Sequence, residues 1–311
     1  MGSNSITISE LLLLLAHIDP TDRETWLKVA MGVHAEFGES GFPYWDQWSQ
    51  GAPNYRARDA RAVWRSIHPG EVTFGTVIHL AKQGGWRPDP NAPRPSKKEI
   101  EERARRAEAA RRKAEAQRAE RHQRAAAEAR RLWEAATPEM GTHRYLIGKG
   151  IGPHGIRSNG YELVILITDV NGDPQSLQFI APNGRKRFLP GGKITGGMYL
   201  IGDVGPAGKL LVAEGFATAA TLRERTGRPV AVAFNCTNLK PVAKALRSKY
   251  PEATLIIAAD NDRHTPGNPG VTKANEAALA VGGRVAVPEF DDDEPGSDWN
   301  DWYNNRREAL A

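Results

Sequence analysis

The sequence predicts a multidomain α+β protein with a small helical N-terminal domain, a long helical linker and a mixed α/β core that ends in a parallel sheet. Three observations support this fold class. The length of 311 residues is about twice that of a typical single domain. Apolar strands alternate with helical segments from residue 209 onwards. Between the two ends, residues 96–136 consist almost entirely of strong helix formers.

The N-terminal domain is predicted at residues 5–87. Five of the eight tryptophans lie there, interleaved with helical patterns at residues 21–36, 56–66 and 73–83. Tryptophans at helical spacing most often belong to a core, so we expect a small helical unit. Repeated prolines from residue 88 to 95 then forbid a helix and favour an extended spacer.

The linker is predicted at residues 88–136, as the proline-rich spacer followed by one long basic helix. Ser96, with Glu99 three residues later, has the pattern of a capping box. Residues 97–134 hold 13 Lys/Arg and 8 Asp/Glu, which accounts for the whole formal net charge of +5. Two interpretations stay open: a solvated spacer, or a helix whose Arg111, Arg118 and Arg121 also contact nucleic-acid phosphates.

Residues 137–208 are predicted to form a basic, antiparallel platform. Asn171-Gly172 lies between two apolar runs, residues 161–168 and 174–180, which is a strong hairpin signal. A second turn at Asn183-Gly184 leads into a segment rich in basic residues and glycine, residues 185–192.

Residues 209–305 alternate between strand and helix. Strands are expected at residues 210–213, 229–234, 253–259 and 284–288, and helices at 218–225, 239–250 and 272–281. Strands joined by helices of this length pair in parallel and are covered on both faces.

Acidic residues follow these strands at the edge where ligands bind in open α/β sheets. Glu214-Gly215 follows the first strand, Asp260 and Asp262 follow the third, and Asp298 and Asp301 lie beyond the fourth. Carboxylates that converge on one edge repel each other unless a hard divalent cation such as magnesium lies among them. Single acidic residues at such turns also serve as helix N-caps, and receiver domains gather aspartates at the same edge. The combination of three groups favours the metal site.

Composition excludes several other classes of protein. Cys236 is the single cysteine, so an internal disulfide and a cysteine-rich zinc site are excluded. The apolar run at residues 11–16 is far shorter than the roughly 20 residues that cross a bilayer, and it lacks the features of a secretory signal. We therefore expect a cytoplasmic protein without membrane contact.

At these residues the sequence resembles the Toprim domain, a parallel Rossmann-like fold shared by bacterial-type primases, topoisomerases and related nucleases. The likeness covers about residues 210–303, and its marks are Glu214-Gly215, Asp260-Asn261-Asp262 and residues 297–301, which look like the Asp-Phe-Asn-Asp segment of phage and plasmid primases. Residues 145–151, 163–172, 178–180 and 185–189 look like the basic N-terminal half of a primase core. Residues 46–49 and 84–86 are similar to the helical accessory module of mobile-element primases.

The resemblance implies a DNA primase, a nucleotidyltransferase that makes short RNA primers on single-stranded DNA in phage or plasmid replication. It implies catalytic roles for Glu214, Asp260 and Asp262. The same three residues, together with Asp298 and Asp301, are expected to bind Mg²⁺ or Mn²⁺. The residues expected to bind nucleotide or DNA are Lys149, Arg157, Lys186, Arg187 and Lys193.

The implied partners are a single-stranded DNA template, nucleoside triphosphates and a replicative helicase. The helicase would be another chain or a further part of this one, because no P-loop sequence is present in these residues. The cysteine-rich zinc module of cellular primases has no counterpart here either. Two alternatives stay open at this stage: a Toprim nuclease, and a non-catalytic replication accessory protein that binds single-stranded DNA.

Overall fold

The computed structural model describes residues 6–67, 72–88, 97–205 and 208–308, and the chain divides into two compact units, Met1–Arg118 and Ala119–Ala311. Most of the predicted proline-rich spacer, and the Ser96 cap, lie outside the described residues. Within the described residues, no helix is both long enough and apolar enough to cross a membrane.

The first unit is helical, as predicted. Its elements are α1 (Ile8–Leu15), α2 (Arg23–Phe37), the 3-10 turn η1 (Gly38–Gly41), α3 (Phe42–Ser49), α4 (Ala57–Ser66) and α5 (Phe74–Gln83). Thr7 and Glu10 cap each other's main-chain N–H groups at the start of α1. Trp45 and Trp64 are fully buried with ring centroids 5.3 Å apart, so the tryptophans form the core.

The long helix α6 (Lys97–Ala135) is continuous over 39 residues and belongs partly to each unit. Its outer face carries ion pairs between side chains three or four positions apart, such as Arg124 with Glu120. Ala125 and Ala129 are buried where the end of α6 lies against the antiparallel sheet. Alanine supplies the small surface that lets the helix backbone approach the sheet closely.

The antiparallel sheet follows α6 in the second unit. Its strand order is β1-β2-β3-β4-β5, with bounds Thr137–Pro138, Arg157–Ser158, Leu163–Thr168, Pro174–Ile180 and Lys186–Phe188. The short helix α7 (Arg144–Lys149) lies between β1 and β2. The predicted hairpin is present as β3 and β4, with Leu163 opposite Ile180, and its turn places Gly172 at a φ of 97°.

The second sheet has the order β10-β9-β7-β8-β6, in which every pair is parallel except β6 with β8. Its strands are β6 (Tyr199–Ile201), β7 (Lys209–Ala213), β8 (Val230–Val232), β9 (Thr254–Ala258) and β10 (Arg284–Ala286). The helices that follow them are α8 (Phe216–Thr226), α9 (Leu239–Lys249) after the 3-10 turn η2 (Cys236–Asn238), α10 (Pro269–Val281) and α11 (Trp299–Glu308).

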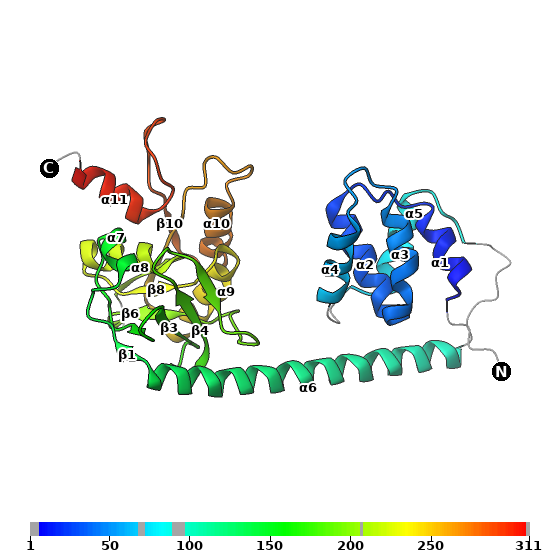
Figure 1. The fold of residues 1–311 in the computed structure, drawn as a ribbon, viewed down its shortest axis with the longest axis horizontal. Coiled ribbons are helices and arrows are strands. Elements are labelled where there is room, and N and C mark those ends of the chain that lie inside the picture. The colour runs from blue at the N-terminus through cyan, green and yellow to red at the C-terminus, as the bar shows by residue number, and fades with distance from the viewer. Residues whose placement is uncertain (1–5, 68–71, 89–96, 206–207, 309–311) are drawn as a thin grey trace. The chain divides into compact units, whose positions relative to one another are not determined.

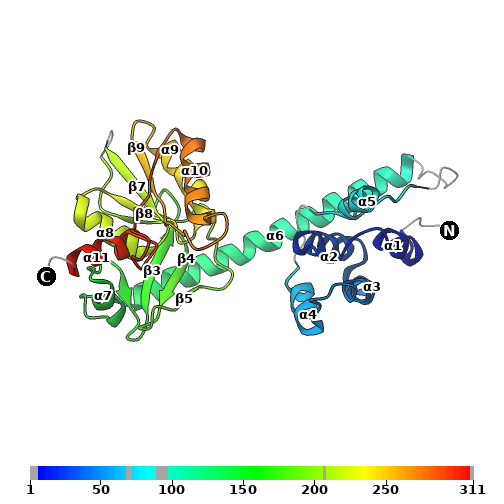
Figure 2. The same ribbon diagram turned by 90° about the horizontal axis from the view of Figure 1, so that it is seen from above.

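Helices cover both faces of this sheet, as the sequence predicts. Leu211 and Ala213 point from β7 into a core with α8, α11 and the antiparallel sheet, whereas Leu210 and Val212 point into a core with α9 and α10. Figures 1 and 2 both show α9 and α10 side by side. The mixed α/β architecture with a parallel sheet is confirmed. Within this sheet, the antiparallel edge strand β6 is the strand that the sequence pattern did not reveal.

Candidate catalytic site

Three predicted carboxylates follow neighbouring parallel strands. Ala213 pairs in register with Ala258, so the two strands end side by side. Glu214 comes directly after β7, and Asp260 and Asp262 come shortly after β9. The parallel register therefore brings the ends that carry these acids to one edge, as expected for a ligand site in this kind of sheet.

Asp260 has the most perturbed carboxyl group at this edge. Its pKa is raised to about 8, first by burial and then by repulsion from Glu214, Asp298 and Asp262. Its Oδ1 is buried and accepts no hydrogen bond from the described part of the chain. A buried oxygen without a partner, surrounded by like charge, is costly for a protein to keep unless something positive binds there.

Glu214 shares this environment. Burial and then the charge of Asp262 raise the pKa of its carboxyl group, while the positive charge of Lys186 and the main-chain N–H of Cys236 lower it. The Lys186 Nζ also lies close to Gly215, 3.8 Å from where a Cβ at that position would be, which is an ordinary contact distance. One lysine therefore faces the acidic group from the antiparallel sheet.

Asp262 is held by the start of α10. Its Oδ2 accepts from the main-chain N–H of Gly270 at 3.0 Å, and its own N–H donates to the Asn268 Oδ1 at 3.0 Å. Asn268 also donates to Asn261 at 2.9 Å, and it adopts a φ of 39°. Gly270 is required at this contact, since a Cβ there would lie 2.3 Å from the Asp260 carbonyl oxygen. Asn268 and Gly270, at the start of α10, were not singled out from the sequence.

Asp298 and Asp301 form the start of α11. The Asp298 Oδ1 accepts from the Asp301 N–H at 2.9 Å, and the Asp301 Oδ2 accepts from the Ser297 N–H at 3.2 Å. This is the N-cap arrangement that the sequence left open as an alternative. Asp298 nevertheless lies close enough to raise the pKa of both Glu214 and Asp260. Asp301 is paired with Lys149 at 3.1 Å.

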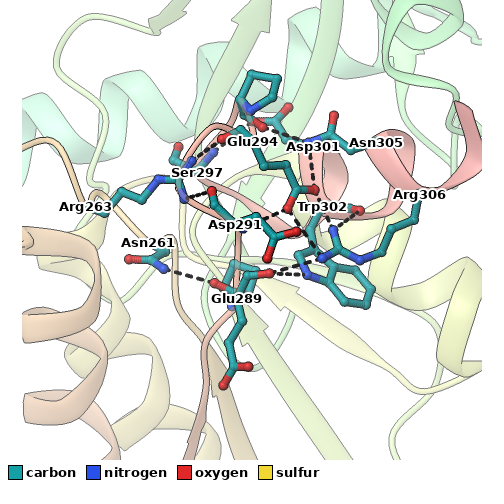
Figure 3. A network of polar contacts seen from close by, with 12 residues as sticks. Asn261, Arg263, Glu289, Asp291, Glu294, Ser297, Asp301, Trp302, Asn305 and Arg306 are labelled. Carbon is teal, nitrogen blue, oxygen red and sulfur yellow. Dashed lines mark hydrogen bonds and ion pairs between the residues drawn. The ribbon is translucent and has the colours of Figure 1, made fainter. Parts of the chain in front are cut away.

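A network of polar contacts fixes the segment before α11, as Figure 3 shows. Arg263 donates to the carbonyl oxygens of Asp291 and Glu294, and Asn261 donates to the Pro288 carbonyl oxygen at 3.0 Å. From α11, Arg306 donates to the Glu294 Oε1 at 2.6 Å. The network ties the loop of Asp260–Asp262 to α11, and so positions Asp298 relative to it.

The residues at this edge fit a hard divalent cation. In the described part of the chain, no three His, Cys, Asp or Glu side chains are placed so that they could hold a metal ion, so the fit rests on the chemistry of the donors. The unpartnered Oδ1 of Asp260 and the mutual repulsion of Asp260, Glu214 and Asp262 are what a magnesium ion, with waters and phosphate oxygens completing its shell, would relieve. The donor set is all oxygen, which suits magnesium or manganese.

The predicted basic residues lie in different surroundings. Lys186 faces the acidic edge, and Lys193 lies exposed in the glycine-rich loop. Arg187 points to the other side of β5, where it pairs with Glu162 and lies 3.9 Å from the Phe179 ring centroid. Lys149 is held by Asp301.

Arg157 is engaged with the end of α6. Its Nη1 donates to the carbonyl oxygens of Trp133, Glu134 and Ala136 at 2.9, 3.4 and 3.3 Å. The last turn of a helix leaves carbonyl groups short of main-chain donors, and Arg157 donates to this end of α6; the Trp133 oxygen also accepts from the Ala136 N–H at 3.3 Å. Its guanidinium also lies over the Trp133 ring, 4.8 Å from the centroid.

Asn238 is a further positioning residue that sequence reasoning missed. It is 3% exposed, and its Nδ2 donates to the carbonyl oxygens of Ile194, Gly197 and Ala233 at 3.1, 2.9 and 2.8 Å. Its Oδ1 accepts from the Gly196 N–H at 2.7 Å. This one side chain holds the glycine-rich loop against the end of β8. An asparagine after a strand is too common a signal to have revealed it.

Two parts of the chain match models of known protein families. Residues 209–308 match the family model of the Toprim domain, and residues 11–81 match "Primase C terminal 2 (PriCT-2)". Two curated Escherichia coli proteins, both named DNA primase TraC, are 39% and 40% identical to this chain over 156 residues. Each match covers 47% of this chain and only 15% or 11% of the relative. The predicted resemblance to Toprim primases of mobile elements is confirmed.

Solved structures with a similar arrangement include the primase fragment of the bacteriophage T7 primase-helicase protein and the DnaG catalytic core. The first is 20% identical, with a TM-score of 0.43, over 57% of this chain and 76% of that one. The second is 17% identical, with a TM-score of 0.35, over 53% of this chain and 56% of that one.

Proposed function

We propose that this Toprim-domain chain is a DNA primase that synthesises short RNA primers on single-stranded DNA by metal-dependent nucleotidyl transfer. The observation that carries the proposal is the buried, unpartnered carboxylate oxygen of Asp260 among repelling acids, with Lys186 opposite. Such a site suits the joining of a 3′-hydroxyl to the α-phosphate of a nucleoside triphosphate with release of pyrophosphate. The named activity of the TraC relatives supports the same reaction.

The acidic edge would hold Mg²⁺ or Mn²⁺. Asp260 and Asp262 are the proposed direct ligands, and Glu214 is either a third ligand or the group that moves the proton of the attacking hydroxyl. Asp298 and Asp301 would orient the groups around the ions and not bind the ions directly, because their oxygens already accept main-chain hydrogen bonds at the start of α11. When bound, the ions supply charge stabilisation to the attacking and leaving oxygens.

The basic groups divide into two roles in this proposal. Lys186 lies where it would neutralise phosphate charge beside the acids, and Lys193, exposed on the glycine-rich loop, would contact the strand or nucleotide. Lys149, Arg157 and Arg187 are each held by a protein partner, so their proposed contribution is to keep the platform in shape. The template is single-stranded DNA, the substrates are nucleoside triphosphates, and a replicative helicase is the proposed partner.

Primer synthesis from labelled ribonucleotides on a single-stranded DNA template with Mg²⁺ tests the proposal. Wild-type protein should extend products, and Asp260→Ala should reduce the rate by at least about 10³-fold, since it removes a proposed ligand of the metal ion. Asp203→Asn is the matched control, because Asp203 is exposed and lies away from the three strand ends. It should leave the rate unchanged.

Other outcomes would select the rival functions. Metal-dependent degradation of the template, lost in Asp260→Ala, would assign a nuclease. Template binding without synthesis or degradation, equal in wild type and Asp260→Ala, would assign a non-catalytic accessory protein.

A further inference from the structure

A hollow of about 440 Å³ lies between α9 and α10, outside the acidic edge described above. Seven residues line it: Cys236, Thr237, Lys240, Pro241, Lys244, Lys273 and Glu276. The residues from Cys236 to Lys244 come from η2 and the first two turns of α9, and the other two come from the first half of α10. Its volume falls within the range of about 300–1,000 Å³ that small-molecule sites occupy.

The hollow opens beside the acidic edge. Cys236 lines it, and the main-chain N–H of the same residue contacts the carboxylate of Glu214. Helices α9 and α10 both begin at the carboxyl edge of the sheet, so their positive ends face the same side as the acids. A ligand in the hollow would therefore lie next to the proposed reaction centre.

The hollow carries a net positive charge. Lys240 and Lys244 are exposed and one helical turn apart, and the described residues form no salt bridge with either, although the charge of Lys240 contributes to lowering the pKa of Glu276. Lys273 lies across from them and is paired with Glu276 at 2.8 Å. Three lysines thus face one glutamate. Like charges at this spacing repel each other, so an anion that bridges them would be stabilised.

We propose that this hollow binds the polyphosphate of a nucleoside triphosphate beside the reaction centre, with Lys240 and Lys244 as its principal contacts and Lys273 as the third. The inference deepens the proposed primase function and rests on it for the identity of the nucleotide. A triphosphate suits the hollow because it carries several charges within a few ångströms. A single strand would instead require basic side chains spread along an extended groove.

The single cysteine supplies a readout that does not depend on catalysis. Cys236 lines the hollow, so an occupant should slow its alkylation by iodoacetamide. We expect inorganic tripolyphosphate and GTP, each added to the full chain without divalent cations, to slow alkylation several-fold at saturation. A 5′-hydroxyl oligodeoxynucleotide should not do so at the same phosphate concentration.

Variants that lack the positive charges of the hollow test whether the polyphosphate binds there. Lys240→Gln/Lys244→Gln should raise the tripolyphosphate concentration needed for half-protection by about tenfold, the loss of about 1.4 kcal/mol of binding. Lys209→Gln is the matched control, since Lys209 is an exposed lysine at the start of β7, at the opposite edge of the sheet. Both variants replace exposed side chains, and thermal melts would show that they fold as the wild type does.

Three results would overturn the inference: no protection of Cys236 by tripolyphosphate or GTP, equal protection in Lys240→Gln/Lys244→Gln, or protection by the oligodeoxynucleotide alone, which would assign a strand to the hollow. Primer synthesis by the same preparations separates this from the wider proposal. Synthesis without protection ends the inference and leaves the primase proposal standing. Protection without synthesis leaves a polyphosphate site and ends the primase proposal.

Discussion

Burial and like charge both raise the pKa of Asp260, which makes its carboxyl group a probe of the acidic edge. With a pKa of about 8, the group is protonated in the folded, metal-free protein at pH values where the unfolded chain has ionised it. The folded state therefore binds the extra proton between about pH 4 and 8. The stability that this group contributes is present at low pH and is lost as pH rises through that window.

The first prediction follows from this sign. In EDTA, Asp260→Asn should melt at a higher temperature than wild type at pH 8 and show a smaller gain at pH 5, because each pH unit in this window costs the wild type about 1.4 kcal/mol. Added Mg²⁺ should raise the melting temperature of wild type at pH 8 and not that of the variant. Thermal melts at the two pH values measure both effects. Equal pH dependence in the two proteins would contradict the assignment.

Arg157 supports a second prediction at this scale. Arg157→Ala should destabilise the second unit by about 1–3 kcal/mol, because the carbonyl oxygens at the end of α6 lose their donor. Arg157→Lys keeps the charge and loses the forked contact, so it should recover only part of this loss. Urea denaturation measures the difference. Full recovery by lysine would show that the charge, and not the cap, is what matters.

Contacts between side chains could be predicted from the sequence where the order of the strands alone determines them. Glu214, Asp260 and Asp262 follow strands whose parallel order could be inferred, so their convergence could be predicted. The partners of Arg187 and Lys149 could not, since Glu162 and Asp301 lie 25 and 152 positions away and no periodic pattern links them. The role of Asn238 could not be predicted for the same reason, since its contacts with the glycine-rich loop join residues 41 to 44 positions apart in the chain.

At the scale of elements, strands that lie within a longer apolar run were predictable, including the three-residue strands β8 and β10, and short strands without such a run were not. The strands β3, β4, β7 and β9 have five to seven residues, enough for an apolar pattern to show. By contrast, β1 and β2 have two residues each and β6 has three. Their pairing depends on neighbours brought in by the rest of the fold, so no local pattern predicts them.

The junction between β9 and α10 gives a third prediction. Gly270→Ala should lower stability by about 1–3 kcal/mol and impair primer synthesis, because its Cβ would meet the Asp260 carbonyl oxygen and shift the acidic loop. Alanine normally favours a helix, so the expected sign is opposite to that of intrinsic propensity.

Gly148→Ala is the matched control for this variant. Gly148 lies within α7, and a Cβ there would meet no atom within 4 Å. We expect it to be neutral or stabilising by up to about 1 kcal/mol. Chemical denaturation of both variants, with primer synthesis measured in parallel, checks the pair. A neutral Gly270→Ala would mean that the loop can move without cost to the site.

At the scale of the whole molecule, the chain carries separate cores. The first unit buries its tryptophan-centred core among α1 to α5, and the second buries three cores around its two sheets. Helix α6 joins the units in sequence, and among its described side chains the buried ones, Ala125 and Ala129, lie in its C-terminal part. The stability of the second unit should therefore depend on where α6 is cut.

The fourth prediction compares two truncations of that helix. A fragment of residues 119–311 keeps the turns of α6 that cover Val164, Leu177 and Phe179, and it should fold cooperatively with a melting temperature close to that of the second unit in the full chain. A fragment of residues 137–311 exposes this apolar surface and removes Trp133 from under Arg157. At about 25 cal/mol per Å² of apolar surface, that loss should cost several kcal/mol. Calorimetry of both fragments measures it, and equal melting temperatures would show that α6 is only a spacer for the second unit.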